Sequence, residues 1–358
     1  MTNATTEHYQ NDALYTVAED INRFAPWESN IAPFMLIDPA HPDAYVLVVM
    51  EDDGEGTSDI RLMLGLTGLR AWLAEQEQEP FADDDVLSAD EFVARYDGYY
   101  LEVGYNMPNL NSYEKRQLDG REHCITFRRQ RPGYGLATIV DNRDFAHLER
   151  YLRAILRLLT KCQLNDDASA RYRLQRQGGK ERFRTAAFLL TEDGPVQTDD
   201  FVLTRSEWLQ ASGCVVDEFT DARVKRLPND GHVYELYFFY LPLMVSGKSM
   251  LPRSFFLVDL ETGFIEWSEV ILPESGWAET LLRRLWDFFF ENGARPDQLL
   301  IQNIGAYTAL AADLKRAGIH NEYISQSYVG QELLDSYLQA THMKAHQMMA
   351  DNFPRDPY

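Results

Sequence analysis

The sequence predicts two domains of the α+β or α/β class, and three observations support this. Its 358 residues are enough for two cores of ordinary size. Hydrophobic residues make up 45% and charged residues 25% of the chain, which is typical of folded proteins. Stretches with helical spacing alternate with shorter strand-like stretches. We expect an N-terminal α+β domain with an antiparallel or mixed sheet at 1–165, a linker at 166–180, and a C-terminal α/β domain with a mixed sheet at 181–358.

The predicted first domain is a sheet flanked by helices. Apolar side chains recur at helical spacing between Asp12 and Phe24, and Pro26 then stops the helix. The same spacing predicts a short helix at 66–74 and a long amphipathic helix at 142–161. Strands are expected between turn signals at 34–37, 45–50, 60–64, 99–105 and 123–128.

The predicted second domain begins with a strand at 182–190 and a helix at 204–211. Further elements follow in the order strand, strand, strand, helix, strand, helix, strand, at 233–244, 254–260, 264–271, 276–291, 298–302, 306–317 and 321–324. Gly263 suits a positive φ in its turn, and Asn292 with Gly293 suits a helix C-cap. A terminal helix is expected at 332–349.

This order of elements is that of the ribonuclease-H-like fold. Enzymes with this fold hold two metal ions with carboxylates, typically on the first strand and at the end of the fourth. Here the first strand offers only Glu235, and the fourth ends in the neutral Gln302 and Asn303. We therefore expect the second domain to be a degenerate, non-catalytic version of the fold.

Two sets of residues resemble known bacterial families. The segment Leu14–Glu28, which ends in NRFAPWE, and FRRQRPGY at Phe127–Tyr134 resemble the domain-of-unknown-function family numbered 7309. FFLVDLETGFI at Phe255–Ile265 and ARPDQLLIQN at Ala294–Asn303 resemble the family numbered 6930. The resemblance covers nearly the whole chain and implies a two-domain cytoplasmic bacterial protein. It implies no reaction, because no catalytic residues are established for either family.

Charge is distributed unevenly along the chain. The formal net charge is −22, so the chain as a whole should be repelled by nucleic acid and anionic membranes. The segment 115–184, however, holds 17 basic and 8 acidic residues. It is interpreted either as a counter-charge or solvated surface, or as a nucleic-acid surface. The arginines of that surface would be Arg128, Arg129, Arg131, Arg171, Arg173, Arg176, Arg182 and Arg184.

Cysteine usage and apolar runs bound the location of the protein. The three cysteines include no CxxC pair, which argues against a disulfide framework or a thiolate zinc site and favours a reducing compartment. The longest apolar runs fall short of the roughly 20 residues that span a bilayer. The first residues lack the basic and apolar regions of a secretory signal. We expect a cytoplasmic protein without membrane contact.

No complete catalytic motif is found in the sequence. His342 and His346 share a helix face but lack a third ligand and the glutamate of HExxH. The GKS at 247–249 lacks the first glycine of a phosphate loop. Asp259 and Glu261 lie in a turn that explains them, although a metal-dependent hydrolase would have to be built around this pair. Cys124 beside His123 predicts no dyad, since adjacent strand residues face opposite ways.

The sequence therefore predicts a non-enzymatic binding or interaction module, with no catalytic residues, metal or cofactor. Its partner would be a protein or a small molecule, and aromatic residues such as Trp27, Trp72, Tyr99, Tyr100 and Tyr134 are candidates to line a groove. Two alternatives stay open: a nucleic-acid-associated protein using segment 115–184, and the metal-dependent hydrolase. The candidate binding residues are Trp27, Arg128, Arg129, Arg131, Tyr134, Asp259, Glu261 and Asn303.

Overall fold

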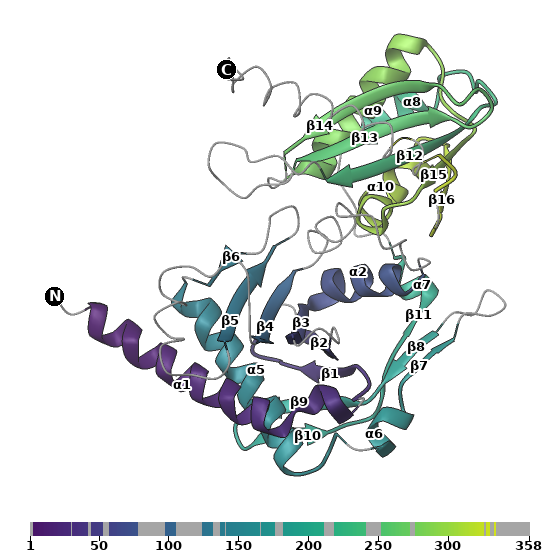
Figure 1. Ribbon diagram of the computed structural model, residues 1–358. Helices are drawn as coiled ribbons and strands as arrows, with labels where there is room; N and C mark the ends of the chain where they lie inside the picture. Colours follow the sequence, from purple (N-terminus) through teal and green to yellow (C-terminus); the bar gives the residue numbers. More distant parts are fainter. Residues whose placement is uncertain are drawn as a thin grey trace, which may run out of the picture. The chain divides into compact units, whose positions relative to one another are not determined.

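The structure is a computed structural model (Figure 1). It describes residues 3–29, 31–41, 44–52, 57–77, 97–104, 124–131, 137–139, 141–164, 166–175, 182–210, 218–240, 252–272, 276–325, 327–329 and 333. The contacts divide the described residues into two units. Unit 1 contains those up to Gln210, and unit 2 contains those from Glu218 onward. The α+β class that the sequence predicts is confirmed.

Unit 1 is built on an eight-stranded sheet of order β10-β9-β1-β2-β3-β4-β5-β6. Neighbouring strands are antiparallel except β1 and β9, which run parallel. The strands are β1 (Phe34–Ile37), β2 (Tyr45–Asp52), β3 (Thr57–Leu64), β4 (Gly98–Gly104), β5 (Cys124–Gln130), β6 (Ala137–Thr138), β9 (Ala187–Thr191) and β10 (Gly194–Gln197).

Helices α1 (Asn3–Phe24) and α5 (Asn142–Thr160) share the main core with one face of this sheet. The core includes Leu148, Leu152 and Ile155 of α5, which follow the predicted helical spacing. Helix α2 (Gly65–Glu77) packs on β2 and β3 (Figure 1), and Val49 of β2 lines a pocket together with Trp72 of α2. Two of these helices are longer than predicted: α1 begins at Asn3 and α2 ends at Glu77.

A second, three-stranded sheet of unit 1 has the order β11-β8-β7. It consists of β7 (Arg173–Gln175), β8 (Arg182–Thr185) and β11 (Phe201–Thr204). The remaining elements of unit 1 are short: η1 (Pro26–Ser29), α6 (Asp166–Ala170) and α7 (Arg205–Trp208).

The boundary predicted at 166–180 moves in the structure to the stretch after Gln210. The single strand predicted at 182–190 is two strands, β8 and β9, which belong to different sheets of unit 1. The carbonyl of Ala186, between them, accepts a hydrogen bond from Met35 N at 2.9 Å. Because β9 then pairs with β1, this part of the chain completes the first sheet and does not begin a second domain.

Unit 2 contains a five-stranded sheet of order β14-β13-β12-β15-β16, in which only β13 is antiparallel to the other strands. The predicted order of strands and helices is confirmed from residue 233 to residue 323 and agrees with a ribonuclease-H-like arrangement, whereas the helix at 218–224 was not predicted. The elements are α8 (Glu218–Val224), β12 (Val233–Tyr240), β13 (Arg253–Asp259), β14 (Ile265–Ile271), α9 (Trp277–Asn292), β15 (Gln298–Ile301), α10 (Ile304–Arg316) and β16 (His320–Tyr323).

Two glycines of unit 2 have the predicted conformation. Gly263 has φ 72° in the turn between β13 and β14, and Gly293 has φ 66° as the C-cap of α9. The terminal helix predicted at 332–349, with His342 and His346, lies outside the described residues, as do His123 and segment 247–249. In the part of the chain that is described, no helix is both long and apolar enough to cross a membrane.

Candidate functional site

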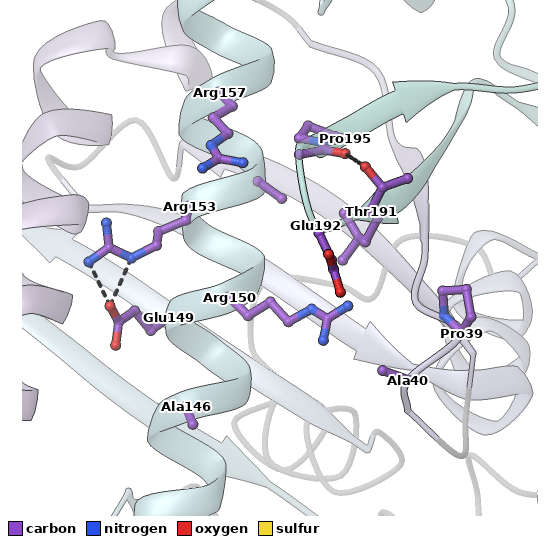
Figure 2. Close-up of a pocket in the computed structure, with 13 residues that line it drawn as sticks. Pro39, Ala40, Ala146, Glu149, Arg150, Arg153, Arg157, Thr191, Glu192 and Pro195 are labelled. Atoms are coloured by element: carbon purple, nitrogen blue, oxygen red, sulfur yellow. Dashed lines mark hydrogen bonds and ion pairs between the residues drawn. The ribbon is translucent and has the colours of Figure 1, made fainter.

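A pocket of about 620 Å³ lies in unit 1 between α5, the β9–β10 hairpin and the loop after β1 (Figure 2). We call it the arginine pocket, because Arg150, Arg153 and Arg157 of α5 line it. Residues at positions i, i+3 and i+7 of a helix lie on one face. The opposite face of α5 is buried in the core, so the amphipathic pattern of this helix places all three arginines at the surface.

Arg150 is held by a buried acid. The Asp38 side chain is 3% exposed. Its Oδ1 accepts a hydrogen bond from Ala40 N at 3.1 Å and forms an ion pair with Arg150 Nη2 at 2.8 Å. Figure 2 shows Arg150 extending from α5 toward the hairpin, whereas Arg153 turns the other way and pairs with Glu149 at 2.6 Å. A buried carboxylate therefore fixes the direction of the pocket's first arginine.

Arg157 lies against the hairpin turn. Gly194 has φ 120°, and a Cβ atom built on it would come within 2.7 Å of Arg157 Nη1. This position therefore needs glycine both for its backbone and for the close approach of the guanidinium. Within the described residues, neither the Arg157 guanidinium nor the Glu192 carboxylate has a hydrogen bond or ion pair. Among the described residues, the pocket thus holds one arginine and one glutamate without an ion-pair partner.

Two histidines pack near the same loop. The rings of His41 and His147 lie 4.8 Å apart in an edge-to-face arrangement. Burial lowers the pKa of His147, and the neighbouring His41 lowers it further. His147 therefore adds little positive charge beside Arg150 at neutral pH.

A second pocket of unit 1, of about 590 Å³, contains the predicted aromatic residues Trp27 and Trp72. We call it the aromatic pocket. Tyr172, which the sequence analysis did not single out, also lines it. Tyr99 and Tyr100 are instead buried within β4, and Tyr134 lies outside the described residues. The structure thus places two residues of the proposed aromatic groove together and separates them from the other two that it describes.

The predicted arginines in β5 and directly after it are paired with acids of unit 1. Arg129 Nη2 lies 2.5 Å from Asp97 Oδ1, and Arg129 and Arg131 both approach Asp144, at 3.5 and 3.4 Å. Arg128 Nε lies 3.9 Å from Glu102 Oε2. Only Arg131 is largely exposed, with 58% of its side chain accessible against 13% for each of the other two.

The later arginines of the basic segment gather around one acid. Arg171 and Arg184 both form ion pairs with Asp200, and Arg182 lines the same shallow pocket. Arg173 is exposed and donates a hydrogen bond to the carbonyl of Tyr172 at 2.7 Å. Arg176 lies outside the described residues. Much of the basic charge is therefore balanced within unit 1 itself.

Asp259 closes its turn, as the turn chemistry predicts. Its Oδ1 accepts from Glu261 N at 2.7 Å, and its Oδ2 lies 2.8 Å from His232 Nδ1. Burial raises the pKa of the Asp259 carboxyl, but hydrogen bonds from Glu261, Thr262 and His232 outweigh it and hold the pKa below its usual value. Groups of three or more metal-ligating side chains are absent from the described ranges, so the hydrolase alternative lacks its required additional acid there.

The two remaining predicted positions of unit 2 also stabilise the fold. Asn303 is the N-cap of α10, and its Oδ1 accepts from Ala306 N at 2.9 Å. Glu235 is fully buried in β12, where its carboxylate accepts from Ser327 Oγ and from Tyr328 N, the latter at 3.0 Å. Burial raises the pKa of Glu235. These groups satisfy backbone and hydroxyl donors of their own unit.

Comparisons with known proteins add a family and no activity. Residues 220–338 match the family described as Domain of unknown function (DUF6930), which confirms the predicted C-terminal resemblance. The predicted N-terminal resemblance stays a prediction. The comparison with curated proteins found no match.

One solved structure was also found. It is a chain from the cryo-EM structure of the simian T-cell lymphotropic virus intasome in complex with PP2A regulatory subunit B56 gamma. The identity is 18% and the TM-score is 0.26, and the match covers 37% of this chain and 45% of that one. A likeness at this level establishes neither a shared fold nor a shared function.

Proposed function

We propose that this protein is a non-enzymatic binding module that takes a small anionic ligand in the arginine pocket. The ligand class is a carboxylate or a phosphate ester. The observation that carries the proposal is the placement of Arg157, whose guanidinium lies at the pocket near Gly194 and forms no ion pair among the described residues, although Glu192 lines the same pocket. Arginine presents a planar fork of donors that matches carboxylate and phosphate oxygens.

Preorganisation of the pocket supports the same proposal. Arg150 is oriented by Asp38, and the Arg157 guanidinium lies close to the turn at Gly194. Side chains that are already ordered lose less conformational entropy when a ligand binds. The volume of about 620 Å³ falls within the range of small-molecule sites.

The charge pairing favours this proposal over the nucleic-acid alternative. Arg128, Arg129 and Arg131 would have to give up their ion pairs with acids of unit 1 in order to meet phosphates. The pairing supports the interpretation of segment 115–184 as an internal counter-charge. The setting that we propose is the bacterial cytoplasm, which rests on the cysteine usage and the family resemblance.

Isothermal titration of the full chain with inorganic phosphate, phosphoserine and succinate tests the proposal. We expect at least one of them to bind, and Arg157→Gln to weaken that binding roughly tenfold, since a charge-assisted hydrogen bond is lost. Arg143→Gln is the matched control, because Arg143 is an exposed arginine of α5 that does not line the pocket. Equal losses in both variants, or no binding tighter than roughly 10 mM, would contradict the proposal.

Fluorescence anisotropy with labelled single- and double-stranded DNA and RNA tests the alternative. We expect no binding at physiological salt. Binding that falls steeply with salt, and that is lost on charge reversal of Arg128, Arg129 and Arg131, would favour a nucleic-acid function instead.

A further inference from the structure

We propose that the aromatic pocket of unit 1 is a second binding site, which takes a small organic cation such as a quaternary ammonium group on a short apolar or hydroxylated chain. The pocket is separate in its lining residues from the arginine pocket, and the two sites differ in the sign of the charge that they favour. The proposal therefore does not depend on the anion site.

The walls of the pocket are arranged for a cation. Trp72 is almost fully buried, whereas Trp27 and Tyr172 are half-buried and line the same space. The ring centroids of Trp72 and Tyr172 lie 6.3 Å apart with an interplanar angle of 69°. Both rings also pack edge-to-face on Phe183, so the aromatic surface open to a ligand is that of the half-buried Trp27 and Tyr172. The negative face of an aromatic ring attracts a cation within about 6 Å of its centroid.

The charge at the pocket has the matching sign. Glu51 and Asp52 line it, and no lysine, arginine or histidine is found among the described residues of its lining. Glu51 pairs with Arg61 at 2.8 Å, but Arg61 also pairs with Asp59 at 3.1 Å. One guanidinium therefore serves two carboxylates, so these three side chains together keep an excess of negative charge. An anionic ligand would be repelled here, and a neutral one would gain no charge attraction from the acids.

The size of the site points to a small molecule. The pocket holds about 590 Å³, within the range of small-molecule sites. Its apolar lining, which includes Ile31, Pro33 and Val49, would cover the methyl groups of the ligand. A trimethylammonium group combines such an apolar surface with a full positive charge.

Titration calorimetry with choline and with its uncharged isostere, 3,3-dimethylbutan-1-ol, isolates the charge from the shape. We expect the full chain to bind choline at least roughly tenfold more tightly than the alcohol. Trp27→Leu should weaken choline binding roughly tenfold, and Asp52→Asn should weaken it by a smaller factor that shrinks as salt is raised. Trp267→Leu in unit 2 and Glu192→Gln in the arginine pocket should leave it unchanged.

Equal affinity for the two probes would overturn the proposal, because the pocket would then be only an apolar cavity. No choline binding tighter than roughly 10 mM would also overturn it. If Trp27→Leu lowers the melting temperature enough to unfold the chain, Trp27→Phe and the exposed Asp52→Asn decide the question. Arg157→Gln separates the two sites, since it should weaken anion binding and leave choline binding intact.

Discussion

In unit 1 the buried carboxylate of Asp38 reaches outward to Arg150, whose side chain stays 43% exposed at a pocket. In unit 2 the buried carboxylate of Glu235 instead accepts hydrogen bonds from the hydroxyl of Ser327 and the amide of Tyr328. Both acids are costly to bury without donors, and both obtain them. They differ in the donor. Arg150 has further N–H groups that it can present to solvent, whereas a backbone amide has only the one that it donates.

This difference separates ligand binding from stability. In unit 2 the polar groups singled out from the sequence, Asp259 and Asn303, also close a turn and cap a helix. Changes at such positions should lower the free energy of unfolding and leave ligand binding in unit 1 alone. Changes around the pockets of unit 1 should weaken ligand binding, and they should lower stability as well only where the backbone is strained, as at Gly194.

Asp221→Ala should cause the largest loss of stability. Asp221 is buried in unit 2, where it accepts from Trp286 Nε1 at 3.2 Å and from Arg316 Nε at 2.9 Å. Its removal leaves the indole without an acceptor and breaks the ion pair, at a cost of about 3 kcal/mol. Urea unfolding followed by tryptophan fluorescence measures this. Asp221→Asn should lose less, and unchanged anion binding in unit 1 is part of the expected result.

Gly194→Ala should affect both stability and binding. A side chain at φ 120° is strained, and its Cβ would meet the Arg157 guanidinium, so we expect a cost of roughly 1–2 kcal/mol and a weaker anion affinity. Gly231→Ala is the matched control, because its φ is 81° but no atom lies within 4 Å of the added Cβ. Thermal unfolding measures the stability of both variants, and calorimetry measures their anion affinity. An equal fall in anion affinity in both variants would contradict the prediction.

Asp59 should make the stability of unit 1 depend on pH. Burial raises the pKa of Asp59 to about 6. The positive charge of Arg61 opposes this rise, and the negative charge of Glu51 adds to it. Because the folded pKa lies above the unfolded value of 3.8, this group stabilises the fold most below pH 4 and loses that contribution as pH rises through 6. The difference in unfolding free energy between Asp59→Asn and wild type should therefore shift in favour of the variant as pH rises from about 4.5 to about 8. The shift should be on the order of 1–2 kcal/mol. A constant difference across pH would argue against it.

His232→Gln should have the smallest effect. The hydrogen bond to Asp259 raises the pKa of His232, burial opposes the rise, and nearby acids add to it. A raised histidine pKa stabilises the fold below the unfolded value of 6.5 and stops doing so as pH rises through the folded value. The variant should therefore lose a little stability at pH 5.5 and none at pH 9. Melting temperatures at the two pH values measure this, and a larger loss at pH 9 would reverse the sign.

Local patterns in the sequence determined most of the elements. Helical spacing located α5, and turn chemistry located the positive φ at Gly263 and the C-cap at Gly293. These signals work because periodicity and glycine conformation depend on neighbouring residues only. The order of elements in unit 2 followed from them directly. The arginines of α5 were visible at positions 150, 153 and 157, but their spacing alone marks only a solvated helix face.

Only the tertiary structure shows which distant residues contact each face of these elements. The sequence by itself did not show that β9 pairs with β1, which moved the domain boundary, nor that Asp38 lies beside Arg150 or Tyr172 beside Trp72. Each of these contacts joins residues about a hundred or more positions apart. Hydrophobic periodicity predicts that one face of an element is buried. It does not predict which other element packs on that face, because the hydrophobic effect is non-directional. The sequence therefore determined the elements and their exposed sides, and long-range packing decided which charges and rings share a pocket.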